Sequence, residues 1–188
     1  MTRILGISGS LRDGSFNTAL LRTARPLVGA GVEFEIATLH GIPLYDGDAE
    51  ARDGLPPAVV ALKEKLAAAD GVLLATPEYN NGIPGVFKNA IDWLSRPAND
   101  IARVFGNRPF ALIGASPGGF GTILAQDAWL PVLHTLGART WHGSRLMVSR
   151  AHTLIGPDGM LEDAKTRAQL ADFINRFAAF ASAATPPN

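Results

Sequence analysis

Short apolar segments alternate with longer amphipathic segments along this chain, and that alternation constrains the fold more than any other feature of the sequence. The short segments are bounded by turn residues and are apolar at consecutive positions, as strands are when helices cover both faces of a parallel sheet. In the longer segments, apolar residues recur at helical spacing. The alternation therefore predicts a doubly wound α/β fold, with a five-stranded parallel sheet and helices on both faces.

The apolar runs and the turn residues between them give the residue ranges of the predicted strands and helices. Strands are predicted at residues 3–8, 32–39, 71–76 and 109–115, with a weaker fifth strand at 140–142 or 145–148. Helices are predicted at residues 17–27, 57–68, 84–94, 121–136 and 161–183. Pro131 has no N–H group to donate within a helix, so we expect it to kink or split the fourth of these helices.

Length and charge narrow the class of protein. With 188 residues, of which 47% are hydrophobic, the chain can bury the core of one domain. We place that domain at residues 1–184 and expect the polar tail at 185–188 to be disordered. The 17 basic and 17 acidic side chains balance to zero net charge, and no basic block points to a nucleic-acid partner.

The N-terminal residues and the amino-acid composition bear on the cellular location of the protein and on the chemistry that it can perform. The first apolar run, at residues 4–7, is too short for a signal peptide or a membrane span, so we expect a cytoplasmic protein with no membrane partner. The chain has no cysteine, which makes any redox activity dependent on a bound cofactor. Its four histidines lack metal-ligand spacing, so we predict no metal site.

The segment GISGSLRDGSFNT, at residues 6–18, is rich in hydrogen-bond donors where the first strand should end. A helix is predicted to begin there, and the free N–H groups at a helix start attract anions. Side-chain donors are supplied by Ser10, Arg12, Ser15, Asn17 and Thr18. The segment has neither the Gly-Lys-Ser/Thr of a Walker loop nor G-x-G-x-x-G, so it predicts a site for one terminal phosphate monoester.

Two further loops follow the third and fourth predicted strands. Residues 75–97, ATPEYNNGIPGVFKNAIDWLSRP, combine prolines, asparagines and one tyrosine in a stiff rim that can hold the edge of a flat ring. Residues 115–122, ASPGGFGT, contain glycines that let the backbone approach a ligand closely. Ligands of doubly wound sheets bind beyond the carboxyl ends of the strands, so we expect the three loops to converge on one site.

Together these segments resemble the NADPH-dependent FMN reductase family, a flavodoxin-like group that includes quinone and chromate reductases and azoreductase-type enzymes. GSLRDGSFN and TPEYNNGIPGVFKNAIDWLSRP are highly specific, SPGGFG is weaker, and the resemblance spans nearly the whole chain. It implies a flavodoxin-like sheet of strand order 2-1-3-4-5, an FMN cofactor and NADPH or NADH as hydride donor. It further implies a small acceptor, such as a quinone, chromate, an azo compound or free flavin.

The resemblance also implies which residues hold the flavin and how subunits assemble. The implied cofactor-binding residues are Ser10, Arg12, Ser15, Phe16, Asn17, Thr18, Pro77, Glu78, Tyr79, Asn80, Asn81, Ser116, Gly118 and Gly119. We name no catalytic acid or base, because the flavin carries the redox chemistry and the protein positions the rings. Tyr79 could also donate a proton. A homodimer or homotetramer is implied, with the helix at 87–94 as the dimer surface and the loop at 41–46 reaching toward a neighbour's flavin.

Two other functions fit parts of the sequence. Residues 114–118 match the G-x-S-x-G of serine hydrolases. Asp127 and then His134 or His142 follow, which is the chain order serine, aspartate, histidine of that class. However, Pro117 lacks the N–H group that the oxyanion hole of that motif needs. A flavodoxin-like electron carrier is the stronger alternative, although such carriers tend to be acidic so that they dock on basic partners. Direct oxidation of NADPH separates a reductase from a carrier.

Overall fold

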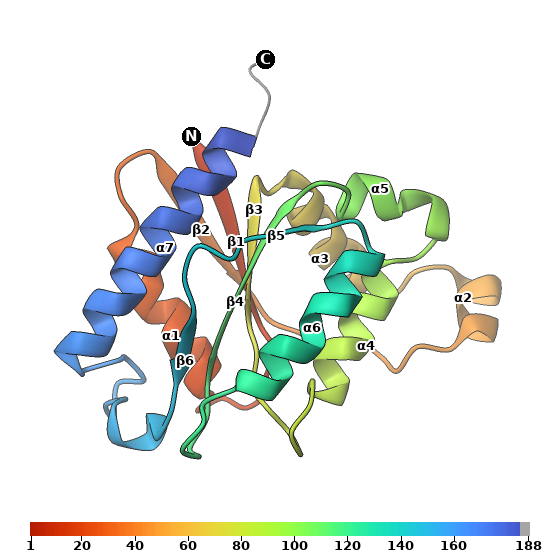
Figure 1. The fold of residues 1–188 in the computed structure, drawn as a ribbon. Helices are drawn as coiled ribbons and strands as arrows, with labels where there is room; N and C mark the ends of the chain where they lie inside the picture. Colours follow the sequence, from red (N-terminus) through yellow and green to blue (C-terminus); the bar gives the residue numbers. More distant parts are fainter. Residues whose placement is uncertain (185–188) are drawn as a thin grey trace.

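A parallel six-stranded sheet forms the centre of this computed structural model, which describes residues 1–184 (Figure 1). The strands are β1 (Thr2–Ser8), β2 (Val32–Ala37), β3 (Gly71–Ala75), β4 (Pro109–Ala115), β5 (Arg139–Thr140) and β6 (Leu146–Val148). The order β2-β1-β3-β4-β5 confirms the predicted flavodoxin-like arrangement. The tail at 185–188, for which we predicted disorder, lies outside the described residues.

The outer strand is divided in two, whereas the sequence predicted one fifth strand at either of two positions. β5 pairs with the start of β4 and β6 pairs with its end. Between them the ring of Trp141 packs edge-on against Phe173 of α7 (Ala164–Ala184), with ring centroids 4.9 Å apart. Each strand piece has only two or three residues, which explains why the sequence signal was weak.

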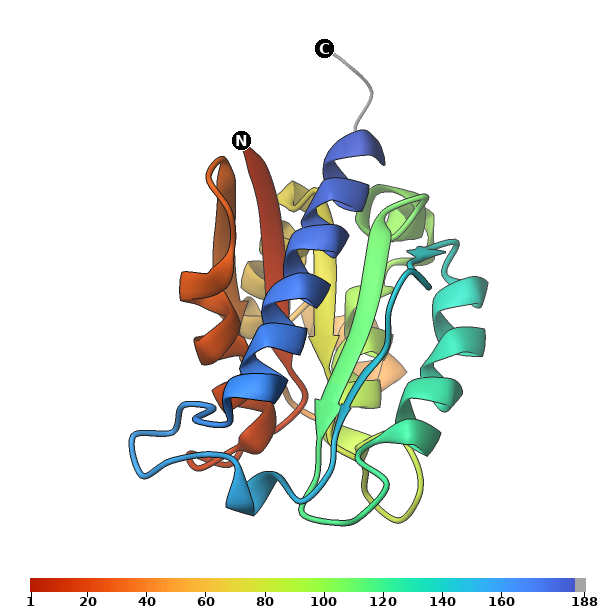
Figure 2. The ribbon, with the colours of Figure 1, turned by 60° about the vertical axis from the view of Figure 1, so that its left-hand side comes forward.

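Helices cover both faces of the sheet, as the views in Figures 1 and 2 show. One face carries α1 (Phe16–Ala24) and α7, and the other carries α3 (Pro57–Ala68), α4 (Gly85–Leu94) and α6 (Ile123–Thr135). Each face therefore has its own hydrophobic cluster. Phe173 and Phe177 are buried in the first cluster, and Trp93 and Trp129 are buried in the second.

Several helix boundaries differ from the prediction for local reasons. α1 ends at Ala24, and the chain continues as a 3-10 helix, Arg25–Leu27, with Pro26 at its start. α7 begins only at Ala164, because the Asp163 carboxylate caps it by accepting from the Thr166 N–H group at 2.8 Å. α6 runs through Pro131 as one helix, so the split that we expected there does not occur.

Short helices escaped the prediction because they bury few side chains. α2 (Gly47–Asp53) has no buried residue, and its start is set by Asp46, whose carboxylate accepts from the N–H group of Asp48 at 2.9 Å. α5 (Ile101–Val104) and the 3-10 helices Ala98–Asp100 and Ala151–Thr153 are each one turn long. Apolar periodicity cannot reveal segments of this kind.

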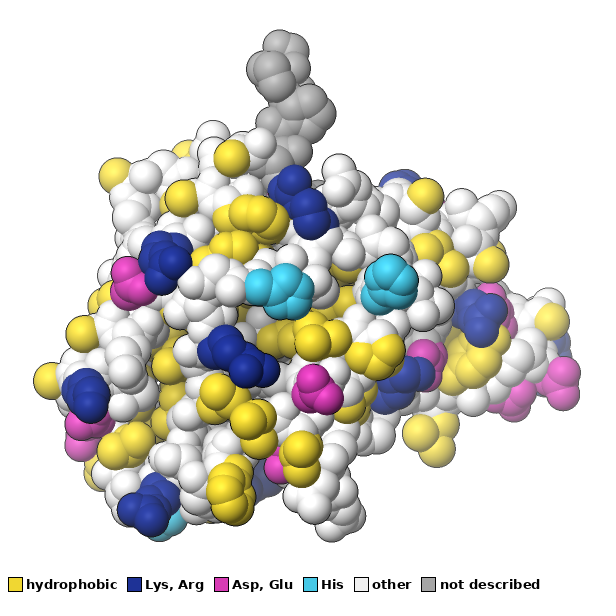
Figure 3. Space-filling model, in the orientation of Figure 1, with side chains coloured by type: hydrophobic (Ala, Val, Ile, Leu, Met, Phe, Trp, Pro, Cys, Tyr) yellow, Lys and Arg dark blue, Asp and Glu magenta, His cyan; other side chains and the backbone are white. Residues whose placement is uncertain are grey.

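The surface agrees with the balanced composition. On the face seen in Figure 3, basic and acidic side chains are interspersed rather than segregated, so this face offers no basic stripe to a nucleic acid. Across residues 1–184, no helix is both long and apolar enough to span a membrane.

Candidate functional site

The loops that follow β1, β3 and β4 meet at the carboxyl edge of the sheet. They enclose a cavity of about 60 Å³ at the start of α1. A space of this volume is on the scale of a phosphate group and is far too small for a whole nucleotide. The lining residues are Ser10, Arg12, Ser15, Phe16, Asn17, Pro77, Glu78, Tyr79, Ala115, Ser116 and Pro117.

The structure places some of the predicted cofactor residues outside this cavity. Those that do not line it are Thr18, Asn80, Asn81, Gly118 and Gly119. Conversely, Ala115 and Pro117 line the cavity although they are not among the cofactor residues that the resemblance implies. Both contribute through their position in the third loop, since neither carries a polar side chain.

The start of α1 supplies donors to the cavity. Ser15 is the N-cap residue, and its hydroxyl oxygen accepts from the Thr18 N–H group at 3.2 Å. Helix geometry leaves the N–H groups of Phe16 and Asn17 without an acceptor inside the helix. The hydroxyls of Ser10 and Ser15 belong to buried residues that line the cavity, only 4% and 6% exposed. Buried donors beside a helix N-terminus suit an anion.

The side chain of Asn17 has a structural partner. Its amide nitrogen donates to the Ala115 carbonyl, and its amide oxygen accepts from the Ala115 N–H group, both at 2.9 Å. Asn17 therefore joins the first loop to the end of β4. The hydroxyl of Thr18 lies 2.7 Å from that of Ser8 and is likewise directed at the sheet. The predicted phosphate donors thus include two side chains whose hydrogen bonds order the loop.

The second loop forms a tight hairpin. The N–H groups of Tyr79 and Gly82 each donate to the other residue's carbonyl at 3.1 Å. Asn80 and Asn81 form the tip with φ of 50° and 63°, the left-handed pair that a type I′ turn requires. The hairpin presents Tyr79 at the cavity with its side chain 46% exposed. The Asn-Asn pair was a readable hairpin signal in the sequence.

Glu78 connects the second loop to α6. Its Oε2 atom accepts from the N–H groups of Leu124 and Ala125, at 2.9 and 3.0 Å. The carboxylate therefore lies at the N-terminus of a helix, where the helix dipole stabilises negative charge. We predicted that Glu78 lines the flavin ring, and the structure gives its side chain this additional partner.

The third loop does not support the serine hydrolase alternative. The Ser116 hydroxyl donates to the Gly121 carbonyl at 2.6 Å rather than to a histidine ring. Gly118 and Gly119 follow on the exposed side of the loop, where a Cβ atom on Gly119 would meet nothing within 4 Å and one on Gly118 would meet only the Ser116 hydroxyl, at 3.8 Å. The packing of this chain therefore does not require glycine at either position. The Gly118 carbonyl accepts from the Arg150 N–H group at 2.9 Å.

Two residues that shape the first loop were missed in the sequence. A Cβ atom on Gly9 would lie 2.1 Å from the Phe87 ring, so only glycine lets α4 pack under this loop. The His40 ring is the second: its Nε2 lies 3.2 Å from the Leu11 carbonyl and its Nδ1 lies 3.1 Å from the Thr38 hydroxyl. Leu11 is 29 residues from His40 in the sequence, so no local motif reveals this contact.

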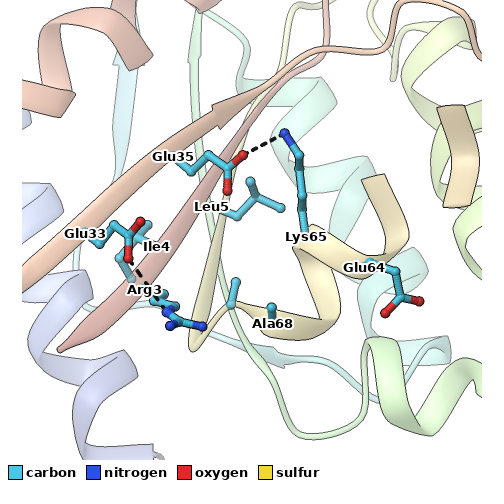
Figure 4. Close-up of a pocket in the computed structure, with 9 residues that line it drawn as sticks. Arg3, Ile4, Leu5, Glu33, Glu35, Glu64, Lys65 and Ala68 are labelled. Carbon is cyan, nitrogen blue, oxygen red and sulfur yellow. Dashed lines mark ion pairs between the residues drawn. The ribbon is translucent and has the colours of Figure 1, made fainter. Parts of the chain in front are cut away.

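A larger hollow lies toward the amino ends of β1 and β2 and differs in character (Figure 4). Its volume is about 320 Å³. The charged side chains there are paired with one another, Arg3 with Glu33 at 3.7 Å and Lys65 with Glu35 at 2.7 Å. Glu64 also lines the hollow and pairs with Arg103 at 2.9 Å, so each of these charged groups already has an ionic partner.

The fold and the site define a class of protein. A flavodoxin-like sheet, with a small donor-lined cavity at the start of α1 and an aromatic hairpin beside it, is typical of α/β proteins that bind a flavin mononucleotide. Residues 2–153 match the family model described as NADPH-dependent FMN reductase. The chain therefore belongs to the NADPH-dependent FMN reductase family.

Individual relatives agree with this assignment. The chain is 46% identical over 165 residues to the NAD(P)H-dependent FMN reductase of Pseudomonas aeruginosa, covering 88% of this chain and 87% of that one. It is 35% identical to the 2-hydroxy-1,4-benzoquinone reductase of a Burkholderia species, covering 95% of each chain. Among solved structures, it is similar to FerB, a flavoenzyme NAD(P)H:(acceptor) oxidoreductase of Paracoccus denitrificans, with a TM-score of 0.85 and 31% identity, covering 97% of this chain and 98% of that one.

These findings confirm the family, the FMN and NAD(P)H cofactors and the class of enzyme that the sequence predicted. The residues at the cavity also fit the cofactor chemically. Two buried hydroxyls, two free N–H groups and the exposed guanidinium of Arg12 surround a space of phosphate size. The electron-carrier alternative is not favoured by any of these relatives, each of which is named as an oxidoreductase or a reductase.

Proposed function

We propose that this protein passes electrons from NADPH or NADH, through FMN held at the cavity, to a small-molecule acceptor of the quinone class. The observation that carries the proposal is the convergence of three loops on a phosphate-sized cavity at the start of α1. The quinone class is supported by the Burkholderia relative, which is named for a benzoquinone substrate. Chromate, azo compounds and free flavin are further candidate acceptors.

In this proposal the first loop binds the phosphate. The hydroxyls of Ser10 and Ser15 and the N–H groups of Phe16 and Asn17 donate to the phosphate oxygens, and Arg12 adds a positive charge at the rim. Bound FMN supplies the chemistry, because it can accept a hydride from the nicotinamide and release electrons to the acceptor. The chain's own contribution is to hold the phosphate between the buried hydroxyls of Ser10 and Ser15 and the start of α1.

The second and third loops hold the ring. The Pro77 to Tyr79 segment lies on one side of the cavity, and Ser116 and Pro117 lie on another. Main-chain N–H groups in these loops would stabilise negative charge that develops on the ring, by the logic of an oxyanion hole. Asn80 and Asn81 at the hairpin tip, and Gly118 and Gly119 beyond Pro117, border the ring from outside the phosphate cavity. Tyr79 covers the ring face and is the candidate proton donor.

Assembly into a homodimer or homotetramer is part of the proposal. The apolar side of α4 is buried within this chain, so the dimer surface would use the polar side of α4 and the neighbouring loop at residues 41–46. That loop is held on α4, because the Tyr45 N–H group donates to Asn89 and the Trp93 ring donates to the Pro43 carbonyl. Leu44 is 81% exposed there and is available to a partner subunit. The cytoplasmic location stays a prediction.

The test combines flavin binding with turnover. Apoprotein is titrated with FMN, and the holoprotein is then assayed for loss of NADPH absorbance with and without a benzoquinone. We expect tight FMN binding and quinone-dependent NADPH oxidation. The double variant Arg12→Ala/Ser15→Ala should bind FMN at least tenfold more weakly, which is a loss of about 1.4 kcal/mol. Arg22→Ala, an exposed arginine of α1 outside the cavity, is the matched control.

Two outcomes would contradict the proposal. If the double variant and the wild type retain FMN equally well, the cavity is not the phosphate site. If the holoprotein binds FMN but NADPH leaves the flavin oxidised without oxygen present, the protein is an electron carrier and not a reductase.

A further inference from the structure

The N-terminus of α6 is capped by a residue from another loop. The N-cap residue of this helix, Thr122, makes no capping bond with its own side chain. Its hydroxyl oxygen instead accepts from the Gln126 amide at 3.1 Å, inside the protein. The Glu78 carboxylate takes over the cap, since it accepts from Leu124 and Ala125. These are the second and third residues of α6, whose N–H groups an N-cap side chain normally satisfies.

Glu78 holds this position from within the flavin-facing loop. Pro77 before it and Tyr79 after it both line the cavity. The hairpin that begins at Tyr79 is closed by two hydrogen bonds between Tyr79 and Gly82, and its tip is exposed. A two-residue hairpin of this size has little stability by itself. Its placement therefore depends on what anchors its first strand, and the Glu78 side chain provides such an anchor.

The other end of the contact belongs to the third loop. Ser116 and Pro117, which line the cavity, lie a few residues before Thr122, where that loop enters α6. Both hydrogen bonds from α6 end on one carboxylate oxygen, so the Glu78 side chain ties the second loop to the point where the third loop enters α6. Those two loops are the walls between which a flat ring would lie.

We infer that Glu78 is a positioning residue for the flavin ring, which acts through the main chain of α6 and not by contact with the ring. This inference rests on the proposed function. The carboxylate also occupies the anion-attracting end of α6. The N-terminus of α1 is thus open to a phosphate, whereas the N-terminus of α6 is occupied by Glu78.

Three variants test this role. Glu78→Ala removes the cap, whereas Glu78→Gln keeps an amide oxygen that can accept from both N–H groups without the charge. Asp163→Ala is the matched control, because it removes a carboxylate cap of the same kind from α7, whose residues do not line the cavity. Each variant is compared with wild type for FMN affinity, for the visible circular dichroism of bound FMN and for thermal unfolding without FMN.

We expect Glu78→Ala to weaken FMN binding at least tenfold and to change the flavin dichroism. Glu78→Gln should stay within about threefold of wild type, because it restores the hydrogen bonds. Asp163→Ala should unfold at a lower temperature and still bind FMN as wild type does. FMN affinity is read without turnover, so the result stands apart from whether the protein oxidises NADPH.

Either of two results would overturn the inference. Wild-type affinity and dichroism in Glu78→Ala, measured below its unfolding temperature, would show that the cap does not position the ring site. Equal losses in Glu78→Ala and Glu78→Gln would show that the two hydrogen bonds to α6 are not what supports FMN binding.

Discussion

Replacing Asn17 with alanine should loosen the fold and the site together. The change removes two hydrogen bonds of 2.9 Å and leaves both main-chain groups of Ala115 without those partners. Ala115 is 2% exposed, so these main-chain groups are buried. Each unsatisfied buried group costs about 1–3 kcal/mol. A water molecule that enters the vacated space recovers part of this, so we expect a net loss of about 3 kcal/mol.

Thermal unfolding measures the expected loss of stability. For a chain of this length, each kcal/mol lowers the unfolding temperature by about 2–4 °C, so Asn17→Ala should unfold roughly 6–12 °C below wild type. Asn17→Asp should be at least as unstable at neutral pH, because a carboxylate oxygen would then face the Ala115 carbonyl in a buried site. FMN affinity should fall about tenfold in both variants, since the hydrogen bonds between Asn17 and Ala115 join the first loop to the third.

A matched asparagine serves as the control. Asn175 also bridges main-chain groups, accepting from Gly29 and donating to Leu27, but it is exposed and lies far from the cavity. Asn175→Ala should cost less than about 1 kcal/mol and leave FMN affinity unchanged. If Asn17→Ala loses no more stability than Asn175→Ala, the argument from the buried main-chain groups of Ala115 is refuted. If Asn17→Ala keeps full FMN affinity, the Asn17 hydrogen bonds do not order the site.

Two further predictions concern the first loop and the ion pairs around α5. Gly9→Ala places a methyl group against Phe87 and Pro77 and should lower the free energy of unfolding by about 1–3 kcal/mol through overpacking. In Gly14→Ala, from the same loop, the new methyl group meets nothing within 4 Å, so the free energy of unfolding should not change. Urea unfolding measures both variants, and equal stability of the two would contradict the prediction. Hydrogen bonds from Arg103 and then Lys63 hold the pKa of Asp100 well below its ordinary value. Because the folded-state pKa is lowered, this stabilisation is present above the ordinary aspartate pKa of about 4 and is lost as the pH falls below it. Urea midpoints measured from neutral to acid pH should therefore fall more steeply for wild type than for Asp100→Asn, and parallel curves would rule out the contribution.

Local patterns explain how much of the fold was predictable. α3 has the predicted bounds because Pro57 starts it and an apolar stripe continues to its end. The central strands are uninterrupted apolar runs, which the sequence displays directly. The outer strand was ambiguous because its pairing depends on where Trp141 packs, and α2 was missed because it buries no side chain.

The site was predictable as a set of loops but not as a set of contacts. The Ser15 cap is a local contact, because its partner Thr18 is only three residues away. The partner of Asn17 lies 98 residues further along the chain, and the N–H partners of Glu78 lie 46 and 47 residues away. Which side chains face a ligand and which hold the loops together is therefore decided by tertiary contacts that residue types alone do not encode.

The division of the outer strand has a consequence for how molecules of this protein meet one another. An open sheet has two margins whose free main-chain groups can recruit a strand from another molecule and begin aggregation. At one margin, β2 carries Glu33 and Glu35, and their charges disfavour such an addition. At the other margin, the interruption between β5 and β6 leaves no run longer than three residues as a template. The break at Trp141 to Arg145 thus protects the protein at high concentration while leaving the parallel core continuous.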